Sequence, residues 1–171
     1  MKTSRLALTC LALLAMMTSG STSAAPRKPA PMRVADIPGT YELVDRVLAN
    51  GKVLKRPEIA ALYTMAGGRA NLNLFVRNAD GSLASESSII RYTLTEDTYC
   101  EWIEFTTRNN LDAPGLTNVA PPVAEHCTKL TITKAGVIFA PPGESVTTTY
   151  YRRGFTAIIA GQFTDHWRKI G

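Results

Sequence analysis

Short stretches of alternating apolar and polar residues fill most of the chain from Gly39 onward, and turn-forming pairs separate them. The first three pairs are Asn50-Gly51, Gly67-Gly68 and Asp80-Gly81. These pairs tolerate the positive φ that tight hairpins require. No long apolar run with a 3.6-residue period lies between them. The pattern predicts an all-β fold, an up-and-down antiparallel β-barrel of about 8–10 strands, because closure protects the edges of a meandering sheet.

The alternation places the strands individually. They are predicted at residues 40–48 (with 53–54 as a continuation), 59–65, 70–77, 85–95, 98–107, 129–133, 137–140, 146–151 and 155–163. The alternation of apolar and polar residues stops at residues 108–122, which contain Asn-Asn, Ala-Pro-Gly and Pro-Pro. This composition predicts a long loop. On the last strand Phe155, Ala157, Ile159, Gly161 and Phe163 share one face. Small residues between large ones are typical of a tapering barrel interior.

The first 24 residues have the layout of a secretory signal peptide. Lys2 and Arg5 precede an apolar run that is too short to span a bilayer, and small residues follow. Cleavage is predicted after Ala24, which places the mature protein in the periplasm or outside the cell. Cys10 lies inside the apolar run, a position that argues against a lipid-attachment site. No membrane insertion is expected after cleavage.

The remaining chain divides into two parts. Residues 25–36 are Pro-rich and polar, which predicts a disordered tether, and residues 37–171 suit one domain. Without Lys2 and Arg5, the 19 basic residues become 17 against 14 acidic ones, a net charge of +3. The basic residues form no continuous stripe that would follow phosphates, so nucleic acid is not an expected partner.

Two cysteines, Cys100 and Cys127, remain after cleavage. An even pair in an exported chain predicts a disulfide. Zinc is the competing interpretation, with His126 beside Cys127, but the chain lacks four ligands at suitable spacing. We therefore predict a disulfide, no metal site and no cofactor.

Several segments resemble bacterial lipocalin-like domains. They are residues 39–44 (Gly-Thr-Tyr-Glu-Leu-Val), residues 51–54, the Tyr63 strand with its glycine turn, and residues 155–169, which end in Thr-Asp-His-Trp-Arg-Lys. The resemblance covers essentially all of residues 37–171. It implies an up-and-down barrel that holds a small apolar ligand. Lipocalins have a tryptophan where Tyr41 stands, packed at the barrel base and often met by a C-terminal arginine, so the resemblance offers Arg168 for that role.

Polar groups offer little catalytic chemistry. Asp165 and His166 are neighbours on a predicted strand, so their side chains point to opposite faces and Asp165 cannot orient His166 as a base. The same divergence separates His126 from Cys127. Glu101 shares a face with Tyr99, Ile103 and Phe105, whereas Cys100, Trp102 and Glu104 share the other, and the pattern leaves open which face is internal. No catalytic residue is predicted.

Four aromatic residues on apolar strand faces are the predicted ligand-binding residues: Tyr63, Tyr92, Phe105 and Tyr150. The predicted function is an exported barrel that binds a small hydrophobic ligand without catalysis. One alternative is a cyclase or isomerase on the same barrel, using Glu101 or His166. Another is an envelope interaction or stress module that contacts a protein through residues 108–122.

Overall fold

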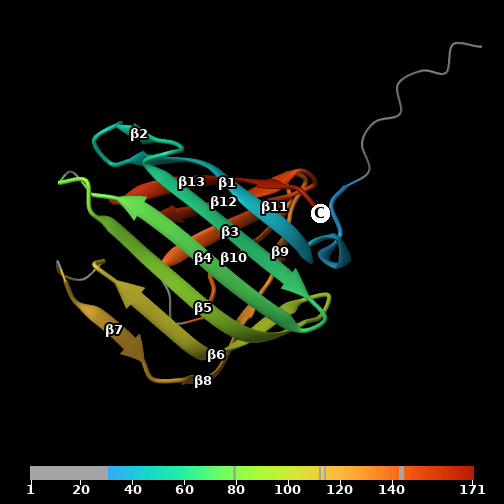
Figure 1. The fold of residues 1–171 in the computed structure, drawn as a ribbon. Coiled ribbons are helices and arrows are strands. Elements are labelled where there is room, and N and C mark those ends of the chain that lie inside the picture. The colour runs from blue at the N-terminus through green and yellow to red at the C-terminus, as the bar shows by residue number, and fades with distance from the viewer. Residues whose placement is uncertain (1–30, 79, 112, 114, 143–144) are drawn as a thin grey trace, which may run out of the picture.

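The structure, a computed structural model, describes residues 31–171 except 79, 112, 114 and 143–144. The predicted signal peptide and residues 25–30 lie outside this range. The described part contains a short 3₁₀ helix, η1 (Val34–Asp36), and thirteen strands that form one antiparallel sheet (Figure 1). The strands are β1 (Gly39–Leu48), β2 (Val53–Leu54), β3 (Ile59–Ala66), β4 (Arg69–Arg77), β5 (Leu83–Leu94), β6 (Thr98–Asn109), β7 (Thr117–Ala120), β8 (Val123–Lys129), β9 (Thr131–Ile132), β10 (Val137–Phe139), β11 (Val146–Tyr151), β12 (Gly154–Ile159) and β13 (Phe163–Lys169).

The sheet curls around an interior. β1 lies in the middle, pairing with β3 on one side and β13 on the other, so that β3–β8 and β9–β13 form two facing halves (Figure 1). The hydrogen-bonded path through the described strands runs from β7 to β9 without closing on itself. The chain instead joins the halves covalently, because β8 leaves β6 at Lys129 and β9 begins at Thr131. The all-β prediction is thus confirmed, and the sheet is a curled half-barrel with more strands than the 8–10 predicted.

The early hairpins form where the turn pairs predict them. Gly51, Gly67, Gly68 and Gly81 all have φ between +57° and +84°. Two later predictions are wrong. Residues 155–163 are not one strand, because a turn with Gly161 at φ +73° separates β12 from β13. The predicted loop at 108–122 contains β7, which pairs with β6.

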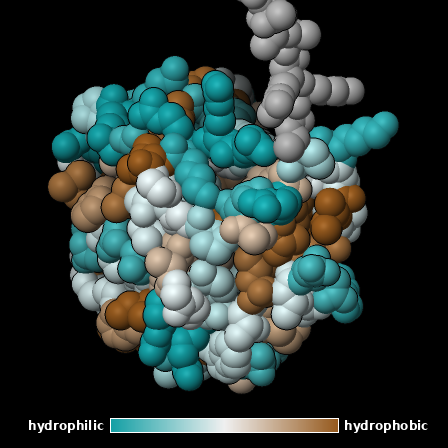
Figure 2. Space-filling view, turned by 90° about the vertical axis from the view of Figure 1, so that its right-hand side faces the viewer, coloured by the Kyte–Doolittle hydropathy of each residue, from teal (hydrophilic) through white to brown (hydrophobic). Residues whose placement is uncertain are grey.

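One end of the curled sheet is closed by the residues that precede it. Met32 and Val34 are buried in the core, Ile37 is fully buried, and the Tyr41 hydroxyl donates to the Ile37 carbonyl. In this structure the last residues of the predicted tether form η1 and contribute Met32 and Val34 to the core. Figure 2 views the molecule from the side on which η1 lies, where apolar and polar side chains together cover the surface.

Tyr41 does lie at this closed end, but its cationic neighbour differs from the one that the resemblance implies. Arg168 is exposed and pairs with Glu42 at 2.8 Å. The ammonium group of Lys169 lies 5.6 Å from the centre of the Tyr41 ring and donates to the carbonyls of Asp36 and Pro38. The described residues contain no helix long and apolar enough to cross a membrane.

Candidate functional site

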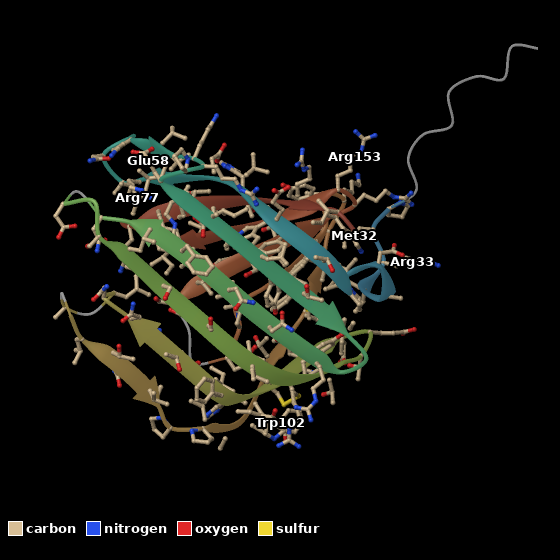
Figure 3. All side chains as sticks on the ribbon, in the orientation of Figure 1. Met32, Arg33, Glu58, Arg77, Trp102 and Arg153 are labelled. Carbon is tan, nitrogen blue, oxygen red and sulfur yellow. A yellow bond between two sulfur atoms is a disulfide. The ribbon has the colours of Figure 1, made fainter. Side chains whose placement is uncertain are left out.

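A cavity of about 550 Å³ lies between the two halves of the sheet. It extends away from the closed end and reaches the surface beside Arg108 and Ser145, which are both exposed. Figure 3 shows the side chains that fill the space between the halves, with Met32 and Arg33 at the closed end and Glu58 and Arg77 at the other. A cavity of this size is in the range of small-molecule sites, which are about 300–1,000 Å³.

Inward-facing positions of both halves form the cavity wall. Seven aromatic rings contribute. One is Phe163 at the start of β13, and the other six come from β3, β6 and β10–β13: Tyr63, Tyr99, Phe139, Tyr150, Phe155 and Trp167. They pack on one another; the ring centres of Tyr99 and Phe139 are 4.9 Å apart, and those of Phe155 and Trp167 are 5.1 Å apart. The wall is thus built from rigid side chains that support one another.

A register shift in β6 decides which of its residues face the cavity. Ile89 pairs with Phe105 and Ile90 pairs with Ile103, so Glu104 has no direct partner on β5. Such a bulge reverses the alternation that follows it. Ile103 therefore lines the cavity, whereas Phe105 turns to the outer face with 41% of its surface exposed.

The same strand brings a carboxyl group into the cavity wall. Glu101 is only 5% exposed, and the Tyr99 hydroxyl donates to its Oε2 at 2.6 Å. Burial raises the pKa of Glu101, and the hydrogen bond from Tyr99 opposes this in part. The face of β6 that carries Glu101 is therefore the internal one, which resolves the choice that the sequence left open.

Two ion pairs from different strands line the other part of the cavity. Arg46 donates two hydrogen bonds to Asp165, at 2.6 and 2.7 Å, and Arg108 pairs with Glu86 at 3.0 Å. The Arg46 guanidinium also lies 3.7 Å from the centre of the Phe163 ring. Asp165 is only 3% exposed, so Arg46 rather than water compensates its charge.

His166 points to the outer face, as alternation requires, and Asp165 does not contact it. The Nδ1 atom of His166 instead lies 2.6 Å from Oδ1 of Asp45 on the neighbouring strand β1. This pair was not predictable from local sequence, because Asp45 and His166 are 121 residues apart and a shift in the β1–β13 register brings them together. The pair lies on the opposite face of the sheet from the cavity wall.

The four predicted ligand-binding residues separate into three groups. Tyr63 and Tyr150 line the cavity. Tyr92 is buried in the core, stacked on Tyr99 with ring centres 6.1 Å apart, and is not part of the wall. Phe105 shares a face with Glu101 by simple alternation, but the bulge turns it to the outer face, away from the wall.

Several wall residues were missed by sequence reasoning. Phe139 lies on a strand of three residues, too short for alternation to reveal its face. Ser88 and Thr106 share a buried hydrogen bond of 3.0 Å, and polar residues of this kind gave no sign of being internal. The bulge that turns Thr106 inward has no signal that counting by two detects.

Cys100 and Cys127 form the predicted disulfide, which joins directly opposed positions of β6 and β8. Glu125 lies close to both sulfur atoms. These sulfurs are bonded to each other and do not offer the two thiolates that zinc would require. The disulfide is consistent with an oxidising compartment.

The fold and cavity define an all-β protein whose curled sheet surrounds a cavity of about 550 Å³. Comparison of the chain with protein-family models, with curated proteins and with solved structures found no match.

Proposed function

We propose that this protein is an exported, lipocalin-like binding protein that holds a small, largely apolar molecule between the two halves of its sheet. The observation that carries the proposal is the cavity of about 550 Å³, whose wall consists mainly of aromatic and aliphatic side chains. A solid interior would have excluded this function. The signal-peptide pattern and the disulfide support export to the periplasm or beyond.

A neutral fluorescent dye tests the proposal directly. Nile red should bind the protein with a fluorescence increase that saturates at one dye per chain. Ala157→Phe should weaken binding about tenfold or more, because Ala157 lines the cavity and the new ring occupies it. Ile158→Phe is the matched control, since Ile158 is exposed on the other face of the same strand.

The two variants separate the cavity from nonspecific adsorption. Equal binding by the wild type and Ala157→Phe would show that the dye does not enter the cavity. Native mass spectrometry of the purified protein should in turn detect a complex of one small molecule per chain.

One observation favours a second candidate, an enzyme of the cyclase or isomerase type. Glu101 faces the cavity, and its raised pKa suits proton transfer to or from a bound molecule. This candidate predicts that a bound ligand is released chemically changed and that Glu101→Gln stops the change. Mass analysis of ligands recovered after incubation with each protein distinguishes binding alone from turnover.

A further inference from the structure

The acidic side chains of the cavity differ in how their charge is balanced. Asp165 pairs with Arg46, and Glu86 pairs with Arg108. Glu101 has no ion pair within the part of the chain that the structure describes. The charged residues of the wall are thus three carboxyl groups and two arginines, and both arginines are already paired.

The surroundings of Glu101 supply hydrogen bonding but no cation. Tyr99 donates to it from the same strand. His126, its opposed residue on β8, is exposed and forms no ion pair with it among the described residues. A carboxyl group that loses its water without gaining a positive partner favours its neutral form, and a ligand cation would reverse that preference.

Aromatic rings lie beside this carboxyl group. Tyr99, which bonds Glu101, packs on Phe139, and Phe139 stacks on Tyr150 with ring centres 5.6 Å apart. All three rings line the cavity. The faces of aromatic rings attract cations, and aromatic sites of this kind are known to recognise ammonium groups.

We propose that the cavity selects a small organic cation, an amine whose ammonium group pairs with Glu101 beside these rings and whose apolar body contacts the rest of the wall. This inference rests on the proposed function and names its ligand class. The charge balance of the wall disfavours an anionic ligand such as a fatty acid, because its three carboxyl groups outnumber its two arginines and both arginines are already paired.

Three probes that share an indole body test this selectivity: tryptamine (cationic), tryptophol (neutral) and indole-3-acetic acid (anionic). Their affinities are measured by displacement of Nile red and by calorimetry at pH 7.5. Tryptamine should bind about tenfold more tightly than tryptophol, and indole-3-acetic acid should bind most weakly. This comparison uses the wild-type protein and needs no variant.

Glu101→Gln keeps the shape of the side chain and removes its charge. It should abolish the advantage of tryptamine over tryptophol, measured as the ratio of the two affinities within each protein. Glu125→Gln, at an exposed position of β8, controls for the loss of one negative charge and should keep the advantage.

The outcomes separate the two proposals. Binding of Nile red and tryptophol without a preference for tryptamine overturns the cation site and leaves the apolar binding function standing. Persistence of the preference in Glu101→Gln also overturns it. Failure of Nile red and all three probes to bind overturns both proposals.

Discussion

Arg46 on β1 and Asp165 on β13 form a bidentate ion pair, with N–O distances of 2.6 and 2.7 Å. Both side chains are largely buried, at 15% and 5% exposure. Each group has lost water and depends on the other for compensation. The pair therefore links directly opposed positions of the two strands beside the cavity.

Removing one partner of this pair should be costly. We expect Asp165→Asn to lower the free energy of unfolding by about 3 kcal/mol, because the Arg46 charge stays buried without its carboxylate. Replacing both residues, Arg46→Met with Asp165→Leu, should cost less. Urea denaturation measures each value.

An exposed pair provides the comparison. Arg168→Gln breaks the ion pair with Glu42, in which Arg168 is 65% exposed, and should change stability by at most about 1 kcal/mol. Equal losses for Asp165→Asn and Arg168→Gln would contradict the role given to burial.

Gly154 admits no side chain at its place on β12. A Cβ atom added there would lie 1.8 Å from the backbone oxygen of Trp167 on β13. Gly154→Ala should therefore force the two strands apart and cost more than about 2 kcal/mol. Gly81→Ala meets nothing within 4 Å and should cost only the strain of its positive φ, about 1 kcal/mol. Thermal denaturation of the two variants should place Gly154→Ala clearly below Gly81→Ala.

The disulfide holds a strand that has few other attachments. Six of the seven residues of β8 are exposed, and within the described sheet β8 pairs only with β6. Replacing both cysteines by serine opens a loop of 27 residues and should cost up to about 3–4 kcal/mol. Hydrogen exchange should then accelerate first in β8, while the amides of β12 and β13 stay protected. Uniform acceleration throughout the sheet would contradict a local role.

The repeating features of the fold were predictable from sequence, and the irregular ones were not. The turn pairs place the hairpins up to β5 because their backbone requirement is local. Glu104 has no partner on β5, and this extra residue turns Phe105 outward and Thr106 inward, the reverse of what alternation predicts. The shift depends on how β6 is aligned with β5. The alternation of apolar and polar residues along a strand does not reveal such a register shift.

The site shows the same division. Tyr63 and Tyr150 were found because each lies on a stretch of strand with regular pairing, where alternation gives the correct face. The partners Arg46–Asp165 and Asp45–His166 are 119 and 121 residues apart, and they meet only because β13 returns to pair with β1. Contacts of this kind follow from strand order, which local sequence does not specify.

Glu101 should make the stability of the protein depend on pH. Burial raises its pKa in the folded state above the unfolded value, so the folded chain holds this proton more tightly. The stabilisation from this group is complete below the unfolded pKa, about 4.3, and is lost as the pH rises through the folded pKa. Glu101→Gln removes the dependence and should be more stabilising, relative to wild type, at pH 8 than at pH 4.

Other groups around Glu101 do not reproduce this effect in that range. Tyr99 on its own strand, Tyr92 on β5 and Tyr150 on β11 all have pKa values raised above 10, so they stay neutral. His126 faces it from β8, and the charges of Arg46–Asp165 and Glu86–Arg108 are present in the wild type and in Glu101→Gln alike. Urea denaturation at pH 4, 6 and 8, with Glu125→Gln and His126→Gln as controls, isolates the contribution of Glu101. A difference between wild type and Glu101→Gln that is constant across these values would show that the carboxyl group is not desolvated, and the assignment of Glu101 to the buried wall of the cavity would be wrong.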